Sequence, residues 1–275
     1  MHLPRGSVSL GHQAQHRGVT ARRRSGPHAY VATTGRILRQ LAADHRSVAM
    51  ILVVPSAVIA LMYFLFVDIP RPPGAPSPFN NACLVMLGVF PLIAMFLITS
   101  ITMQRERVSG TLERILTTPL RRVDLLAAYG TAFSVAAAAQ ASLACVVAFW
   151  LLGFETAGSP LLVIGIAIIN AVLGVGLGLL CSAFARTEFQ AVQFMPLVIA
   201  PQLLLCGILV PRAALPGWLQ WISNAMPASY ALEALREVGA HPALTGTALR
   251  DIAVVVVFAV AALCLAAATL RRRTP

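Results

Sequence analysis

The stretch Ala82–Met103, ACLVMLGVFPLIAMFLITSITM, contains no charged residue and is long enough to cross a bilayer as a helix. A helix rises about 1.5 Å per residue, so it needs about 20 apolar residues to cross a hydrocarbon core of roughly 30 Å. Five further stretches meet this test, and their apolar residues run continuously instead of alternating as in the strands of a membrane barrel. The chain is therefore predicted to be an all-α integral membrane protein. The six predicted spans are 48–67, 82–103, 125–152, 161–185, 191–210 and 252–270.

The composition of the chain supports the same class. Of its 275 residues, 58% are hydrophobic and 11% are charged, against roughly 25% charged in an ordinary soluble domain. None of the six predicted spans contains Asp, Glu, Lys, Arg or His. Ionisable residues at membrane depth are typical of proton relays and ion sites. Their absence from the spans argues against a proton-coupled carrier, a pump with its own charge relay and a selective cation channel.

The basic residues of this chain are all arginine, because the sequence contains no lysine. A phosphate-binding G-x-x-x-x-G-K-[ST] loop and a Schiff-base amine both require lysine. We therefore expect no ATPase site and no enzymatic activity in the chain itself. If ATP drives its function, we expect another polypeptide to bind the ATP and Mg²⁺, so no cofactor and no metal are predicted here.

The arginines also predict how the chain is oriented. Seventeen of the 21 fall on one side of the spans, and only Arg71, Arg212, Arg236 and Arg250 fall on the other. Because cytoplasmic loops carry the excess of basic residues, both termini are predicted to be cytoplasmic. The net charge of +11 then reflects these loops, and no nucleic-acid partner is expected. Arginine without lysine, together with abundant alanine, suggests a high-GC bacterial genome and hence a cell (plasma) membrane.

Two segments before the first span differ in character. Residues 1–29 are rich in arginine, and we expect a disordered cytoplasmic extension there. From Tyr30 to Leu41, apolar residues recur at helical spacing with polar residues around the other side. This pattern predicts an amphipathic helix that lies on the inner membrane surface.

Polar and small residues within the spans have two interpretations. Amides at membrane depth more often join helices than contact a substrate, but either role fits the sequence. Gly174 and Gly178 form a small-x-x-x-small pair, which predicts close helix packing. The five cysteines lie inside apolar runs without C-x-x-C spacing, so we interpret them as packing residues. The amides that could serve in helix packing or in a pathway are Gln140, Asn170, Gln193 and Gln202.

The loop after the second span has the most informative pattern, QRERVSGTLERILTTPL over residues 104–120. Leu112, Ile115 and Leu116 form an apolar stripe with i, i+3, i+4 spacing between Gly110 and Pro119. The pattern predicts a short amphipathic helix on the cytoplasmic face. Such a helix is too short to be stable alone, so we expect it to dock against another surface.

This loop resembles the permease subunits of type-2 ATP-binding-cassette (ABC) exporters, particularly the daunorubicin-resistance, multidrug branch. Arg105 and Glu106 begin the matching pattern, which continues through the Gly-Thr-Leu-Glu run to Pro119 and Leu120. A second matching stretch follows the fifth span, from Pro211 through Trp218 to Arg236. One departure is that the family often has a Gly-Lys pair where this chain has Ala128 and Tyr129.

The resemblance implies a fold and a set of partners. Residues 30–271 would form the permease domain, with a pair of short outer-face helices between the fifth and sixth spans. The chain would pair with a nucleotide-binding ABC ATPase and with a second permease, identical or paralogous, among membrane lipids. The resemblance implies a coupling helix over residues 106–117 that receives the motion of the ATPase. The residues implied to couple the two subunits are Glu106, Gly110, Thr111, Leu112, Glu113, Ile115 and Leu116.

A pathway without ionisable residues suits export of a hydrophobic or amphiphilic compound, such as a drug, a polyketide or an envelope lipid. Two alternatives stay open. One is export of a polysaccharide or glycolipid, which would favour more aromatic residues than the 7% present. The other is a membrane assembly factor that transports nothing.

We predict that a reporter fused after Pro275 reports the cytoplasm and that one inserted beside Gly158 reports the outside. The reason is the one-sided distribution of arginine. Paired fusions to a phosphatase that is active only outside the cell and to a fluorescent protein that folds in the cytoplasm provide the measurement. An external C-terminus would contradict the six-span topology.

Overall fold

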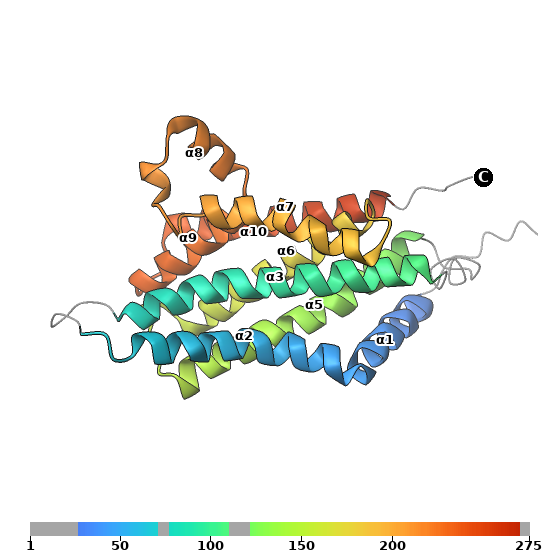
Figure 1. Cartoon of the computed structure of the whole chain (residues 1–275), viewed down its shortest axis with the longest axis horizontal. Coiled ribbons are helices and arrows are strands. Elements are labelled where there is room, and N and C mark those ends of the chain that lie inside the picture. Colours follow the sequence, from blue (N-terminus) through green and yellow to red (C-terminus); the bar gives the residue numbers. More distant parts are fainter. Residues whose placement is uncertain (1–26, 71–76, 110–121, 270–275) are drawn as a thin grey trace, which may run out of the picture.

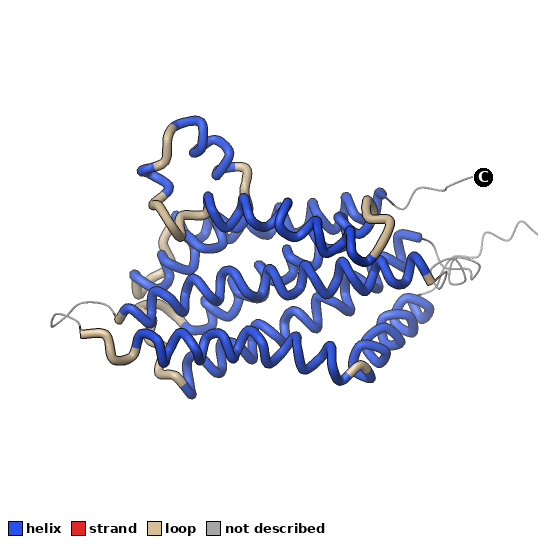
Figure 2. The backbone as a smooth tube through the Cα atoms, in the orientation of Figure 1, coloured by secondary structure: helices blue, strands red, loops and turns tan. Residues whose placement is uncertain are grey.

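The computed structural model describes residues 27–70, 77–109 and 122–269. These residues form helices joined by loops and contain no strand (Figures 1 and 2). The elements are α1 (Pro27–Ala43), α2 (His45–Phe66), α3 (Pro78–Val108), α5 (Arg122–Val146), the π-helical turn η1 (Val147–Leu151), α6 (Pro160–Ser182), α7 (Glu188–Leu205), the 3₁₀ turn η2 (Arg212–Ala214), α8 (Gly217–Asn224), α9 (Pro227–Ala240) and α10 (Gly246–Thr269).

Six of the described helices are long and apolar enough to cross a membrane, which confirms the predicted all-α, multi-pass fold. Their ends differ from the sequence prediction in physically simple ways. Helix α3 continues past the apolar run at both ends, because nothing in its polar flanks breaks a helix. Helix α7 ends at Leu205, shortly before Gly207 adopts a φ of 91°, a left-handed conformation that glycine tolerates. Helix α10 begins at Gly246, so it includes Asp251.

Local sequence fixes the starts of several helices. Pro78, Pro160 and Pro227 occupy the first turns of α3, α6 and α9, where proline loses no hydrogen bond and its fixed φ suits the helix. Thr187 caps α7, and its side chain accepts a hydrogen bond from the backbone N–H of Gln190. These residues determine where each connecting loop ends and the next helix begins.

Helix α6 lies against α3 with almost no side chain between the two backbones. A Cβ added at Gly174 would stand 2.4 Å from the carbonyl oxygen of Leu92, and one at Gly178 would stand 2.6 Å from that of Phe96. The structure confirms the predicted packing role of this glycine pair. On another face of α6, a Cβ at Gly176 would stand 2.9 Å from the Cβ of Ala262 in α10. Helix α6 therefore packs so closely against both α3 and α10 that only glycine fits at these contacts.

Helix α1 covers the predicted amphipathic segment and packs beside the bundle at one end (Figure 1). Its Ile37 is 4% exposed, and the Tyr30 hydroxyl and the Thr131 hydroxyl of α5 lie 2.5 Å apart. The start of α1 and the end of α10 lie at the same end of the bundle (Figure 1). The location of α1 at the membrane surface stays a prediction.

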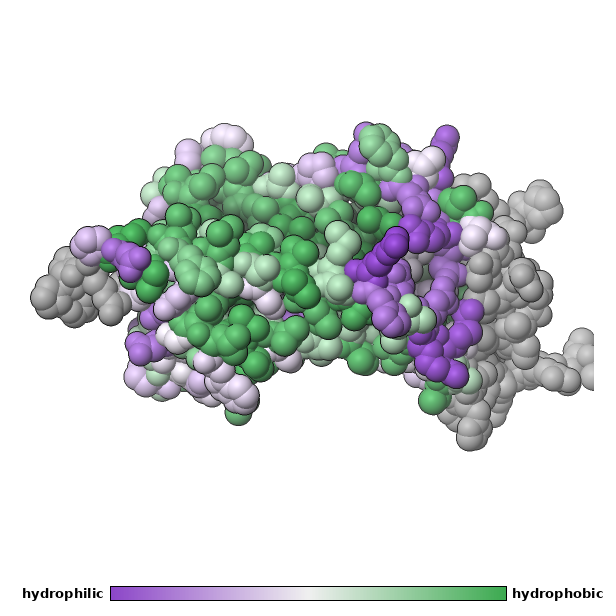
Figure 3. Space-filling model, turned by 60° about the horizontal axis from the view of Figure 1, so that its bottom comes forward, coloured by the Kyte–Doolittle hydropathy of each residue, from purple (hydrophilic) through white to green (hydrophobic). Residues whose placement is uncertain are grey.

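The surface has a broad apolar belt and a hydrophilic band at one end (Figure 3). On α2, Val53, Leu61, Phe64 and Leu65 are all more than half exposed, with Phe64 at 71%. Large apolar side chains that are exposed along a whole helix suit contact with lipid.

Two short helices, α8 and α9, lie between α7 and α10, as the resemblance implied (Figure 1). Arg212 connects them. Its guanidinium donates hydrogen bonds to Ser223, Asn224 and Glu233, and its Cζ lies 5.1 Å from the centre of the Tyr230 ring. One arginine thus fixes α8 against α9.

We predict that Gly174→Ala destabilises the protein by about 1–3 kcal/mol, because the new methyl group would overlap backbone atoms of α3 that cannot move alone. Gly165→Ala in the same helix is the matched control, since no atom lies within 4 Å of its added Cβ. Thermal unfolding in one detergent would compare the two variants. Equal melting temperatures for both would contradict the close-packing account.

Candidate functional site

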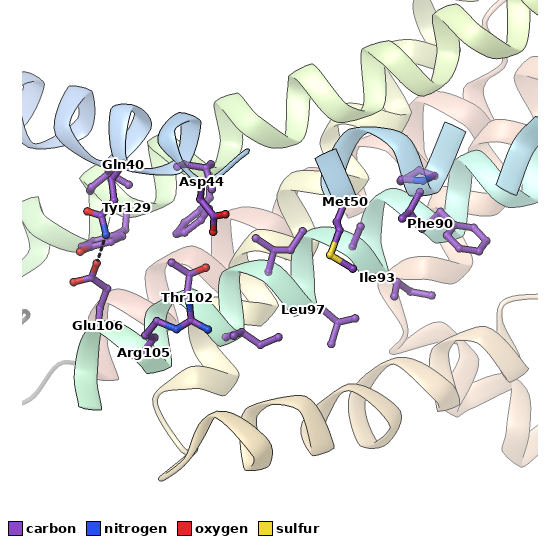
Figure 4. Close-up of a pocket in the computed structure, with 18 residues that line it drawn as sticks. Gln40, Asp44, Met50, Phe90, Ile93, Leu97, Thr102, Arg105, Glu106 and Tyr129 are labelled. Carbon is purple, nitrogen blue, oxygen red and sulfur yellow. Dashed lines mark hydrogen bonds between the residues drawn. The ribbon is translucent and has the colours of Figure 1, made fainter. Parts of the chain in front are cut away.

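A crevice opens between α1, α2, α3 and α5 (Figure 4). Its volume is about 500 Å³, within the range of roughly 300–1,000 Å³ typical of ligand pockets. The lining has a polar end and a longer apolar part. The polar end consists of Gln40, Asp44, Thr102, Arg105, Glu106 and Tyr129, and the apolar part includes Met50, Val54, Phe90, Ile93, Leu97 and Ile101.

The periodicity of α3 explains why one helix supplies so much of the lining. Phe90, Ile93, Leu97 and Ile101 are three or four residues apart, so they share one face of the helix. The opposite face, which includes the buried Leu92 side chain, packs against α6. Because that packing fixes α3 from behind, its other face is left to line the crevice.

Glu106 connects α3 to α1 at the polar end of the crevice. Its Oε1 accepts a hydrogen bond of 2.9 Å from the side-chain amide of Gln40, drawn as the dashed line in Figure 4. Glu106 is only 6% exposed, although it lies in the last turn of α3. Its other oxygen, Oε2, is buried and has no hydrogen-bond partner among the described residues.

Tyr129 of α5 lies beside Glu106 in the same lining (Figure 4). Its side chain is 1% exposed, and its hydroxyl has no hydrogen-bond partner in the described part of the chain. The hydroxyl nevertheless lies near Glu106 and Arg36, and both side chains are placed to act on it through their charges and as hydrogen-bonding groups. The polar end therefore has two buried oxygen atoms, on two helices, that can still form hydrogen bonds.

Arg105 connects the same end of α3 to the start of α7. Its Nε and Nη2 donate to the two carboxylate oxygens of Glu188, each at 3.2 Å. Both side chains are substantially exposed, 64% for Arg105 and 45% for Glu188, so the pair contributes at most about 1 kcal/mol to stability. The pair matters for the charge of the site, because Glu188 balances the positive charge of the Arg105 guanidinium.

The coupling residues implied by the resemblance fall in two places. Glu106 lies in α3, where its carboxylate faces α1. The remaining six lie outside the described residues. They are Gly110, Thr111, Leu112, Glu113, Ile115 and Leu116.

The four amides at membrane depth have separate environments. Asn170 donates to the Gly88 carbonyl of α3, and Gln202 accepts from the backbone N–H of Ala228 in α9, so these two join helices. Gln140 is fully buried, and its side chain has no hydrogen-bond partner among the residues described. Gln193 is exposed on α7. None of the four lines the crevice.

Sequence reasoning did not identify most of the polar end of the crevice. From the sequence, Gln40 and Asp44 are interpreted as part of the solvent-facing side of an amphipathic helix. Tyr129 is noted only as a departure from a family pattern. The available signal was the helical spacing of Ile37, Gln40, Leu41 and Asp44, which indicates a shared face but not what covers it. Within the described ranges, no cluster of His, Cys, Asp or Glu has the geometry of a metal site.

Comparison with known proteins adds a family. Residues 28–238 match the model described as ABC-2 type transporter. The chain is 29% identical over 141 residues to the probable multidrug ABC transporter permease YbhR of Escherichia coli (strain K12), a match that covers 50% of this chain and 38% of that protein. It is 28% identical over 142 residues to the linearmycin resistance permease protein LnrN of Bacillus subtilis (strain 168), covering 52% and 37%.

A third relative is ABC transporter G family member 20 of Dictyostelium discoideum, 29% identical over 141 residues that cover 51% of this chain and 19% of that protein. The chain thus matches well under half of the length of each of these relatives. The family match is much broader, because it extends from α1 into α9 and includes every helix that lines the crevice. The chain belongs to the ABC-2 type transporter family.

Proposed function

We propose that the chain is the membrane-spanning permease of an ATP-driven exporter and that it moves a hydrophobic or amphiphilic compound out of the cell. The observation that carries this proposal is the family match over residues 28–238, on a chain with six helices of membrane length. The names of the relatives, a probable multidrug permease and a linearmycin resistance permease, support a drug-like compound. The crevice, apolar along most of its length, has the chemistry to hold part of such a molecule.

The energy source in this proposal is a separate nucleotide-binding ABC ATPase that holds ATP and Mg²⁺. The chain has no lysine with which to build a phosphate-binding loop of the usual kind. A second permease, identical or paralogous, completes the pathway. Both termini face the cytoplasm, a proposal supported by the one-sided arginines and by the shared end of α1 and α10 (Figure 1).

The ATPase would dock on residues 106–117, where Leu112, Ile115 and Leu116 form an apolar stripe in the sequence. Burial of one such side chain contributes roughly 1.5–3 kcal/mol. We therefore predict that Leu112→Asp combined with Leu116→Asp removes most of the docking energy and abolishes recovery of the ATPase. Pull-down from membranes and export of a reporter drug by intact cells give the two measurements.

Two controls accompany this pair of substitutions. Glu113→Ala should have a smaller effect, because an exposed ion pair contributes only about 0–1 kcal/mol. Leu244→Asp introduces the same charge at an exposed leucine between α9 and α10, and it should leave ATPase recovery unchanged. Normal recovery and export by the double aspartate variant, inserted at wild-type levels, would show that these residues do not couple the subunits.

The division of labour gives a separate prediction. The purified chain should neither bind nor hydrolyse ATP, whereas the complex recovered from native membranes should do both. Equilibrium binding of a fluorescent ATP analogue to the pure chain provides the measurement. Saturable, magnesium-dependent binding would contradict the proposal that another polypeptide supplies the nucleotide site.

A further inference from the structure

The strongest indication of a ligand is the environment of Glu106. A buried carboxylate is costly unless it is paired and its oxygens are hydrogen-bonded. Glu106 forms one hydrogen bond, from Gln40, and Oε2 has no hydrogen-bond partner among the described residues. No arginine or histidine of the described ranges forms an ion pair with it. A donor that enters the crevice would satisfy this oxygen.

The charges around the crevice favour a positively charged donor. The charged residues in the lining are Asp44, Arg105 and Glu106. Arg105 already forms two hydrogen bonds to Glu188, which lies outside the lining. Arg36 adds a positive charge near Tyr129 but does not line the crevice. The polar end therefore offers the carboxylate of Glu106 to a positively charged donor, whereas the guanidinium of Arg105 is already paired.

The apolar part limits the rest of the ligand. On α3 the lining extends from Phe90 to Glu106, a helix rise of about 24 Å. Ile93, Leu97 and Met50 point into this part of the crevice (Figure 4). A ligand that fills both parts has one charged end and a long apolar body.

We propose that the crevice binds an amphiphile with an aliphatic ammonium group, which donates hydrogen bonds to Glu106 Oε2 beside the Tyr129 hydroxyl, while its apolar body lies along α2 and α3. The proposed contacts do not depend on the export function. Only the identification of the ligand as the exported compound rests on that proposed function. The same chemistry occurs in an exported amine and in the ethanolamine headgroup of a bilayer lipid. Either source would use the same contacts.

The test measures binding to the purified full chain in phosphatidylcholine nanodiscs without ATP or an ATPase. The probe is a dodecyl chain with a primary ammonium at one end and a dansyl fluorophore at the other. A matched probe carries a hydroxyl group in place of the ammonium. Wild-type protein should bind the ammonium probe about tenfold or more tightly than the hydroxyl probe, since the hydroxyl can donate a hydrogen bond to Glu106 but has no positive charge to pair with the carboxylate.

Three substitutions separate the contacts. Glu106→Gln can still accept from Gln40 but removes the charge, and it should weaken ammonium binding about 10- to 100-fold with little effect on the hydroxyl probe. Tyr129→Lys would place a tethered ammonium beside Glu106 and should exclude the ammonium probe. Ala94→Phe, which fills the lining, should weaken both probes. Glu155→Gln, at an exposed loop position, is the matched control for charge removal and should bind as wild type.

Each outcome decides the proposal. Equal affinity of wild type for the two probes would overturn it, as would undiminished ammonium binding in either Glu106→Gln or Tyr129→Lys. If Glu106→Gln fails to fold, Tyr129→Lys and Ala94→Phe provide the decision. Competition by phosphatidylethanolamine added to the discs would identify a bilayer lipid as the source, and its failure would favour an exported amine. Loss of binding here leaves the export proposal standing, because no measurement in this set uses ATP or the ATPase.

Discussion

The close contact between α3 and α6 is the constraint on which the rest of the structure depends. Helices in a bilayer gain little from the hydrophobic effect when they associate, because lipid is as apolar as leucine. They depend instead on close packing and on hydrogen bonds between helices. Gly174 and Gly178 bring α6 against the backbone of α3, and Asn170 adds a hydrogen bond to the Gly88 carbonyl. With α3 held on this side, the face from Phe90 to Glu106 lines the crevice.

Charged residues at the far end of the bundle from α1 have structural partners. Arg212 binds Glu233, Arg236 donates to the Gly207 carbonyl, and Arg250 forms an ion pair of 2.8 Å with Asp251. Arg212 and Arg236 thus hold a loop and helix ends in place, whereas Arg250 pairs with its neighbour within α10. These partners explain why arginine occurs on the predicted outer side. Its presence there therefore conflicts less with the predicted orientation than unpaired arginine would.

The fold could be predicted from the sequence because continuous apolar runs and small-residue spacing are local signals. The site could be predicted only in part, because the crevice combines α1, α2, α3 and α5, and no local pattern shows which helices become neighbours. Glu106 illustrates the difference. In the sequence it belongs to a charged segment that appears solvated, yet Gln40, 66 positions away in the chain, turns it into a buried group. Asp251 was missed for a similar reason, since it precedes the last apolar run but is fully buried within α10.

The position of Glu106 connects the two proposed roles of this end of the protein. It closes the polar end of the crevice, and it also lies in the last turn of α3, at the start of the segment proposed to meet the ATPase. The hydrogen bond between Gln40 and Glu106 is 2.9 Å long, and such a bond weakens steeply when the donor and acceptor move apart by about a further half ångström. Any rotation or shift of the end of α3 therefore changes the bond to Gln40, and with it the environment of the carboxylate. Because α1 and α2 are separated only by Asp44, Gln40 is also close in sequence to the helix that forms the other wall of the crevice.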